Sequence, residues 1–194
     1  TTGSSVSYTG SDMTTDDFNS LLRDVDLFEL FDQDDHSRLR DATDLLELSR
    51  NDVIFEEGAE ANACFVMVGG RVAISNKSVD GRESMVAIMT KGDLFGEMSL
   101  FDEGGRSAEA RALEKCVVVR VPYSVLRLIW EERPELLWSV VRLLSKRIRA
   151  TDEALADPFF LDVTGRTAKH LLDLAGEEEV FEIPITQEEL AGLV

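Results

Sequence analysis

Hydrophobic positions change their spacing twice along the chain. Before Asp52, two sets of apolar residues repeat at helical spacing, first Phe18, Leu21, Leu22 and Val25 and then Leu39, Leu45, Leu46 and Leu48. This spacing is typical of amphipathic helices. It predicts two short helices, the first capped by Thr14 or Thr15.

From Asp52 to Val121 the pattern is that of strands. Short β-rich runs, VIF, FVMV, VAIS, MVAIM, AEARA and CVVVRV, are separated by Gly58, Gly69-Gly70, Asp80-Gly81, Gly92-Asp93 and Gly104-Gly105. Such regular punctuation predicts an all-β barrel or sandwich over about Val53 to Val121. The Asp80-Gly81 pair predicts a hairpin turn between the third and fourth runs.

Beyond Val121 the spacing is helical again. One predicted helix carries Val125, Leu126, Ile129 and Trp130 on one face, and Pro134 suits the first turn of the next. That next helix bears a heptad set, apolar except for Thr151, in alternating steps of four and three, at Leu137, Val141, Leu144, Ile148, Thr151 and Leu155. The set fits either a core-facing helix or a seam that pairs with a second helix. We prefer pairing, because the helix is long and keeps the seam to its end.

The last forty residues predict two further helices. After Asp157-Pro158, Asp162 or Thr164 can cap a helix that Gly176 ends. Thr186 and Glu189 then have the spacing of a capping box, which opens a helix near the end of the sequence at Val194.

Composition favours a globular protein. The 194 residues are 44% hydrophobic, enough for one core and a smaller appendage. No run of eighteen apolar residues occurs and the first ten residues carry no basic or apolar stretch, so we expect a cytoplasmic protein with no membrane partner. Residues 1–12 are polar and featureless, as in a leader or disordered tail ahead of an initiating Met13.

Cysteine, histidine and charge narrow the chemistry. Cys64 and Cys116 stand far apart in apolar surroundings, so we expect buried free thiols. With only His36 and His170 besides, we expect no metal site. The formal net charge of -18 disfavours DNA binding by these residues, because affinity for DNA rests on Lys and Arg.

The segment GDLFGEMSLFDEGGRSAEARA, residues 92–112, holds the candidate binding chemistry. Gly96 allows a ligand to approach the backbone, Arg106 offers a planar fork for phosphate oxygens, and Ser107 adds a hydroxyl. Glu97 would repel a phosphate but can accept from a sugar hydroxyl and hold Arg106 in place. Together these residues predict a site for a nucleotide.

The same segment resembles a known family. FGEMSLFDEGGRSA resembles the phosphate-binding cassette of the cyclic AMP receptor protein and FNR family of transcription regulators, also called the catabolite activator family. EEGAEANACFVMVGGRVAI is similar to the glycine-marked strands of that family, and FLDVTGR to the hinge before its DNA-binding domain. The resemblance covers about Leu27 to Val194.

The resemblance implies an α+β fold and a division of the chain. Residues 13–133 would form N-terminal helices and a cyclic-nucleotide-binding jelly roll, a double-stranded β-helix. Residues 134–157 would form a long dimerisation helix, and 158–194 part of a winged helix-turn-helix domain. The recognition helix is expected beyond Val194, so the acidic charge would describe only part of the protein.

The resemblance also assigns roles to residues. Gly96 and Glu97 match positions that meet the ribose, Arg106 and Ser107 match those that hold the cyclic phosphate, and Met98 and Ser99 complete the cassette. On the long helix, Arg147 and Thr151 match ligand contacts, while Asp152 replaces the Ser or Asn that the family supplies from the partner subunit.

A carboxylate at residue 152 accepts from the amine of adenine but cannot donate to the carbonyl of guanine, which favours cyclic AMP. We therefore expect cyclic AMP to be an allosteric effector of a homodimer. The implied partners of the full-length protein are double-stranded DNA and RNA polymerase.

Other functions share parts of this pattern. A redox or gas sensor on the same scaffold needs clustered cysteines or haem-binding histidines, and the chain has no cysteine before Cys64. A regulatory subunit of a kinase or channel would lack the features of FLDVTGR and ITQEELAGLV. An enzyme with a cupin barrel needs clustered metal-binding histidines, so we expect no enzymatic activity. A same-scaffold regulator that senses another ligand, or no nucleotide, is the remaining alternative.

Overall fold

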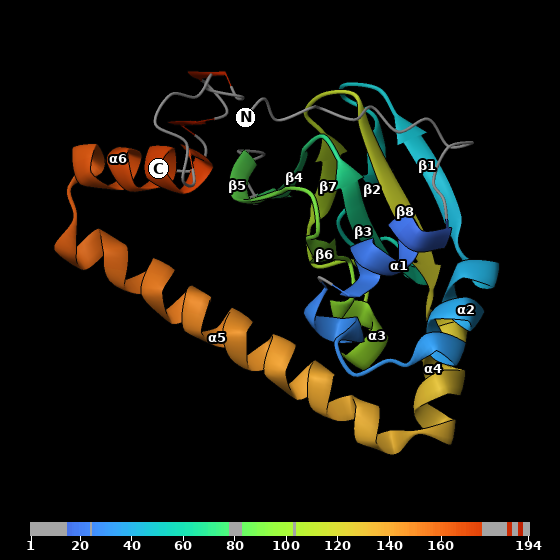
Figure 1. Ribbon diagram of the computed structural model, residues 1–194. Helices are drawn as coiled ribbons and strands as arrows, with labels where there is room; N and C mark the ends of the chain where they lie inside the picture. The colour runs from blue at the N-terminus through green and yellow to red at the C-terminus, as the bar shows by residue number, and fades with distance from the viewer. Residues whose placement is uncertain are drawn as a thin grey trace, which may run out of the picture.

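The computed structural model describes residues 15–23, 25–77, 83–102, 104–175, 186–187 and 190–191. Figure 1 shows a body of strands with short helices at one end, from which a long helix leads away. The strands are β1 (Asp44–Leu48), β2 (Val53–Phe55), β3 (Ala63–Gly69), β4 (Val72–Lys77), β5 (Glu83–Met89), β6 (Leu94–Phe95), β7 (Glu109–Ala112) and β8 (Cys116–Pro122). The helices are α1 (Thr15–Arg23), η1 (Asp26–Phe28), α2 (Gln33–Ala42), α3 (Met98–Asp102), α4 (Tyr123–Glu132), η2 (Pro134–Leu136), α5 (Leu137–Phe160) and α6 (Val163–Ala175).

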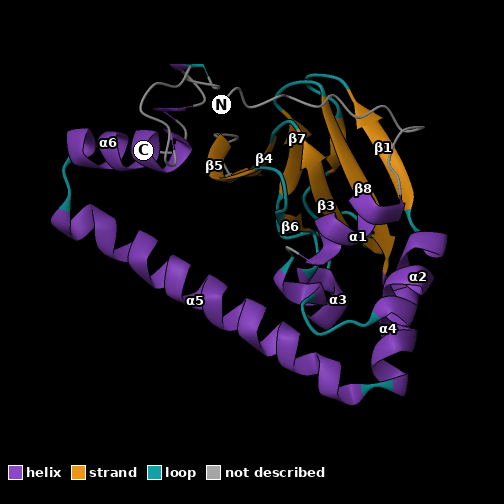
Figure 2. Cartoon of the chain, viewed as in Figure 1, coloured by secondary structure: helices purple, strands orange, loops and turns teal. Residues whose placement is uncertain are grey.

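The strands form two four-stranded antiparallel sheets, in the orders β1-β8-β3-β6 and β2-β7-β4-β5. Figure 2 shows them gathered in one body, with α1, α2, α3 and α4 close to it. Strands β4 and β5 pair as the predicted hairpin, although its turn lies outside the described residues. The expected α+β fold with a β-barrel ligand domain is therefore confirmed.

Two hydrophobic clusters hold these layers together. One combines the inner faces of both sheets, including Phe65, Phe95 and Val118. The other lies between the first sheet and the helices, where Leu22, Phe28, Leu126 and Ile129 are fully buried. Full burial of such side chains stabilises a fold by about 1.5–3 kcal/mol each, which fixes the short helices on the sheet.

The second predicted helix is wrong beyond Ala42. Helix α2 includes Leu39, but Leu45, Leu46 and Leu48 lie on strand β1, which pairs with β8 along its whole length. Leucine and glutamate are good helix formers, but intrinsic helix propensity is a small effect, and pairing with the valine-rich β8 outweighs it. The barrel therefore begins at Asp44 rather than Val53.

The cysteines are free and buried, as expected. Burial raises the pKa of Cys116 to about 11 and raises the pKa of Cys64 further, with Glu97 adding to the effect at Cys64. Both thiols therefore stay protonated at neutral pH and serve as small apolar side chains.

Helix α5 has two distinct apolar sets. Val140 and Leu143 are buried against the first part of the chain, and the hydroxyl of Ser139 donates to the carbonyl of Leu27. The predicted heptad seam is a different set and is exposed: Leu137 (42%), Val141 (48%), Leu144 (37%), Ile148 (62%) and Leu155 (64%). The seam therefore does not face this chain's core.

Helix α5 continues to Phe160, so the helical break follows the predicted domain boundary at residue 158 by a few residues. Asp162 caps α6, because its side chain accepts from the backbone N-H of Gly165 at 2.8 Å. Further on, the N-H of Leu190 donates to the carbonyl of Thr186, while Glu189 of the predicted capping box lies outside the described residues. Leu190 packs against Ala73 and Leu113. Within the described part of the chain, no helix has the length and apolar character needed to cross a membrane.

Candidate functional site

Gly96 lies at the turn where strand β6 ends, and its conformation suits glycine only. Its φ of +73° belongs to the left-handed region. A Cβ there would lie 2.7 Å from Nη1 of Arg106 and 3.1 Å from the ring of Phe55. Any side chain would therefore collide with the neighbouring guanidinium and ring, which explains a glycine at this position.

Glu97 is completely buried. Its Oε1 accepts a hydrogen bond from Nη1 of Arg147 on α5, whose Nη2 also donates to the carbonyl of Leu94 at 2.7 Å. The other carboxylate oxygen, Oε2, is buried and has no hydrogen-bond partner. Burial raises the pKa of Glu97, and the attraction of Arg147 opposes this only in part.

Arg106 lies in the loop between α3 and β7 and is only 5% exposed. Its Nη1 donates to the carbonyl of Gly96 at 2.6 Å, and its Nη2 to the carbonyl of Ala63 at 2.7 Å. The guanidinium carbon sits 4.2 Å from the ring centroid of Phe55, a favourable cation-π contact. Nε is buried without a partner. Arg106 thus has a buried donor, and Glu97 a buried acceptor, that no other group uses.

Tyr123, the first residue of α4, completes this cluster and was missed by the sequence interpretation. Its hydroxyl donates to the carbonyl of Gly96 and accepts from Nη1 of Arg106 at 3.1 Å. Burial raises its pKa to about 12, so the phenol keeps its proton at neutral pH. No local motif marks this tyrosine, since its partners are 17 and 27 residues away in the sequence.

The other cassette residues surround this cluster. The hydroxyl of Ser99 donates to the carbonyl of Gly105 at 3.1 Å and so closes the loop that leads back to Arg106. Ser107 is exposed, and its hydroxyl lies 3.6 Å from the sulfur of the exposed Met98. The hydroxyl of Ser107, next to Arg106 in the sequence, is thus accessible from solvent.

The two remaining predicted ligand residues, Thr151 and Asp152, lie on α5 beyond Arg147 and are exposed. The hydroxyl of Thr151 donates to the carbonyl of Arg147 at 2.9 Å, one helical turn back. The structure therefore brings Gly96, Glu97, Arg106 and Arg147 together, while Thr151 and Asp152 continue along the open face of the helix.

Comparison with known proteins agrees with this geometry. The family model described as "Cyclic nucleotide-binding domain" matches residues 45–133. The CRP-like cAMP-activated global transcriptional regulator of Mycobacterium tuberculosis is 36% identical over 156 residues, which are 77% of this chain and 70% of that protein. The chain belongs to the CRP family of transcriptional regulators.

Further CRP-family proteins give the same result. The cAMP-activated global transcriptional regulator CRP of Escherichia coli O157:H7 is 32% identical over 148 residues, covering 73% of this chain and 70% of that protein. The solved structure of the Xanthomonas campestris regulator CLP, described as c-di-GMP responsive, has a TM-score of 0.69 and 26% identity, with 84% of each chain covered. The catabolite activator protein of Thermus thermophilus has a TM-score of 0.60 and 27% identity, covering 86% of this chain and 78% of that one.

Membership of the CRP family settles the broad function. The chain is a cyclic-nucleotide-responsive transcription regulator and not an enzyme. This result excludes the alternative functions of a kinase or channel regulatory subunit and of a cupin enzyme. The effector differs among the relatives, as the name of the Xanthomonas protein shows.

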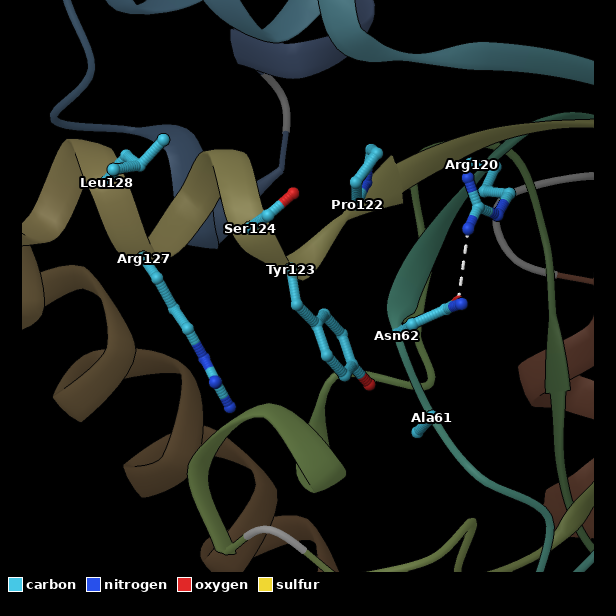
Figure 3. A pocket seen from close by; sticks show the side chains of 8 residues that line it. All are labelled: Ala61, Asn62, Arg120, Pro122, Tyr123, Ser124, Arg127 and Leu128. Carbon is cyan, nitrogen blue, oxygen red and sulfur yellow. Dashed lines mark hydrogen bonds between the residues drawn. The ribbon is translucent and has the colours of Figure 1, made fainter.

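A surface hollow of about 580 Å³ lies next to the buried cluster of this CRP-family protein. Figure 3 shows the ring of Tyr123 between Arg127 on one side and Asn62 on the other, with Asn62 accepting a hydrogen bond from Arg120. Neither Glu97 nor Arg106 lines the hollow. The candidate effector site of the CRP-family chain is therefore the buried cluster and the adjoining face of α5.

We expect Glu97 to give the protein a distinctive pH dependence. Because its folded pKa lies above the ordinary value of 4.5, the native state binds more protons than the unfolded state between those two values. The contribution of Glu97 to stability therefore falls as the pH rises through that window. Urea unfolding between pH 4.5 and 7.5 should show a free energy of unfolding that falls with pH relative to the Glu97→Gln variant.

The Glu97→Gln variant serves as the control. The carboxyls of Asp32, Glu132 and Glu135 also titrate, but they do so in both proteins, so their effect cancels in the difference between the two free energies of unfolding. A difference that instead grows with pH would mean that the attraction of Arg147 outweighs burial.

Proposed function

We propose that the protein binds cyclic AMP at the cassette and that binding controls a DNA-binding domain that begins after α5. The observation that carries the proposal is that two buried polar atoms, Oε2 of Glu97 and Nε of Arg106, each lack a hydrogen-bond partner. A buried polar atom without a partner costs about 1–3 kcal/mol. A ligand with a phosphate and sugar hydroxyls would offer a partner to each.

Each residue has a specific part in this proposal. Arg106 binds the cyclic phosphate, with the hydroxyl of Ser107 as an added donor. Glu97 accepts from a ribose hydroxyl, and the absence of a side chain at Gly96 leaves room for the guanidinium of Arg106. Charge-assisted hydrogen bonds of this kind contribute about 1.5–3 kcal/mol each.

The proposed signal passes through Arg147. This residue of α5 already donates a hydrogen bond to the carboxylate of Glu97. A ribose hydroxyl that binds the same carboxylate would therefore alter a contact between the barrel and the helix. An effector shifts a conformational equilibrium only by its differential affinity for the two states. Glu97 and Arg147 are where such a difference would arise.

We further propose that the chain acts as a homodimer through the exposed seam of α5, at Leu137, Val141, Leu144, Ile148 and Leu155. Contiguous exposed apolar side chains of this kind are characteristic of an interaction site. Thr151 and Asp152 on the same helix would then meet ligand at the subunit boundary. As a regulator of transcription it would act on double-stranded DNA with RNA polymerase, in the cytoplasm.

The test is a calorimetric titration of the 194-residue chain with cyclic AMP, cyclic GMP and c-di-GMP. We expect saturable binding of one cyclic AMP per chain, roughly tenfold tighter than cyclic GMP, since the carboxylate of Asp152 cannot donate to guanine. The Asp152→Asn variant, whose amide donates and accepts, should narrow this preference several-fold.

Asp162→Asn, which makes the same chemical change beyond α5, is the matched control and should leave the preference unchanged. Tight binding of c-di-GMP with no heat from cyclic AMP would replace the proposed effector. No heat from any of the three, in protein shown to be folded, would refute the proposed site.

A further inference from the structure

The carbonyl of Gly96 receives two hydrogen bonds, one from Nη1 of Arg106 at 2.6 Å and one from the hydroxyl of Tyr123. The same Nη1 also donates to the tyrosine oxygen. The three groups thus form a closed triangle, in which the carbonyl has both of its acceptor positions filled.

Arg106 has few donors to spare for a ligand. Nη1 donates to Gly96 and Tyr123, and Nη2 donates to the carbonyl of Ala63 at 2.7 Å, so two of the five N-H groups are unused, that of Nε and the second one of Nη2. A phosphate that binds end-on, through Nη1 and Nη2, must take an Nη1 donor away from Gly96 or Tyr123, because both hydrogens of Nη1 are already used. A buried carbonyl left without any donor would oppose binding.

The position of Tyr123 allows its hydroxyl to remain a donor to the Gly96 carbonyl when Arg106 no longer donates to it. Its side chain is 5% exposed, and its backbone N-H donates to the carbonyl of Asn62 at 2.8 Å, next to Ala63. Since burial raises its pKa to about 12, the phenol keeps its proton throughout the neutral range. Figure 3 shows the ring reaching from the start of α4 toward the green segment that contains α3.

We propose that Tyr123 is a positioning residue for effector binding, which holds the Gly96 carbonyl by a hydrogen bond when Arg106 turns its Nη1 donor to a ligand phosphate. Tyr123 acts through Arg106 and Gly96 and does not itself bind the ligand. The inference rests on the proposed function and adds to it a residue outside the cassette.

The test is a double-mutant cycle measured by titration with cyclic AMP. Tyr123→Phe removes one hydroxyl and keeps the ring, and we expect it to raise the Kd roughly fivefold to tenfold, the effect of one hydrogen bond. In an Arg106→Lys background the same change should raise the Kd by less than about twofold, because lysine has no fork to share between carbonyl and phosphate. Ser124→Ala removes a hydroxyl from the neighbouring exposed residue and should leave the Kd unchanged.

The outcomes separate this inference from the proposed function. If Arg106→Lys binds cyclic AMP as well as the parent, the proposed function fails. If Arg106→Lys weakens binding but Tyr123→Phe has no effect, or has the same effect in both backgrounds, the role of Tyr123 is refuted and the proposed function stands.

A second measurement applies even if Tyr123→Phe does not fold. The chain has two tyrosines, so a Tyr8→Phe protein labelled with 3-fluorotyrosine carries fluorine at residue 123 alone. Saturating cyclic AMP should shift this fluorine resonance, because Arg106 ceases to donate to the tyrosine oxygen. A resonance that stays in place while cyclic AMP is bound would overturn the inference.

Discussion

Replacing Arg106 by alanine should weaken cyclic AMP binding by at least about a hundredfold. The change removes two or more charge-assisted hydrogen bonds to the phosphate, each contributing about 1.5–3 kcal/mol, and 1.4 kcal/mol corresponds to a factor of ten. The guanidinium is buried, so solvent does not screen it. Titration calorimetry of the parent and Arg106→Ala proteins measures the effect.

Arg71→Ala is the matched control for this change. Arg71 forms an ion pair with Glu114 on the protein surface, where such pairs contribute little. Its loss should leave the Kd for cyclic AMP within about twofold of the parent. An Arg106→Ala protein that is folded and binds cyclic AMP as tightly as the Arg71→Ala protein would exclude Arg106 from the site.

The second large effect concerns the seam of α5. Ile148 is 62% exposed and lies in the middle of the seam, so Ile148→Glu would place a carboxylate from each subunit in the proposed dimer interface. Burying a charge without a partner costs several kcal/mol, and we expect the dimer to dissociate at least about a hundredfold more readily. Sedimentation equilibrium across a range of protein concentrations measures this directly.

Ala150→Glu adds the same charge to the same helix two residues away, off the seam, and should leave the dimer intact. Equal dissociation of both variants would point to general charge repulsion in a chain of net charge -18. A stable Ile148→Glu dimer would mean that the subunits meet elsewhere.

The β-barrel was predictable because its strands are short, β-rich and separated by glycines. The error at Leu45, Leu46 and Leu48 has the same origin, since no glycine stands between α2 and β1 and three leucines fit a helix as well as a strand. What decides their conformation is the pairing of β1 with β8, about seventy residues later. Local patterns carry no information on such a partner.

The candidate site was predictable only in part for a similar reason. Gly96, Glu97 and Arg106 lie within one short segment, so their shared chemistry can be read in the sequence. Tyr123 lies outside that segment and would pass for an ordinary aromatic residue at the start of a helix. Its hydrogen bonds exist only because strand β8 ends beside the start of β3, which the register of Ala63 with Pro122 makes visible.

The position at which α5 is attached to the barrel determines how far the end of the helix moves when the helix tilts. Among the described side chains, the last that joins α5 to the barrel by a hydrogen bond or ion pair is Arg147. At 1.5 Å per residue, the helix from there to Phe160 is a rigid arm of about 20 Å. A tilt of about 10° about Arg147 would displace the far end by about 3.5 Å, which is comparable to the rise of two residues in a helix. Any small tilt of α5 at the contact between Arg147 and Glu97 would therefore be enlarged where α6 begins.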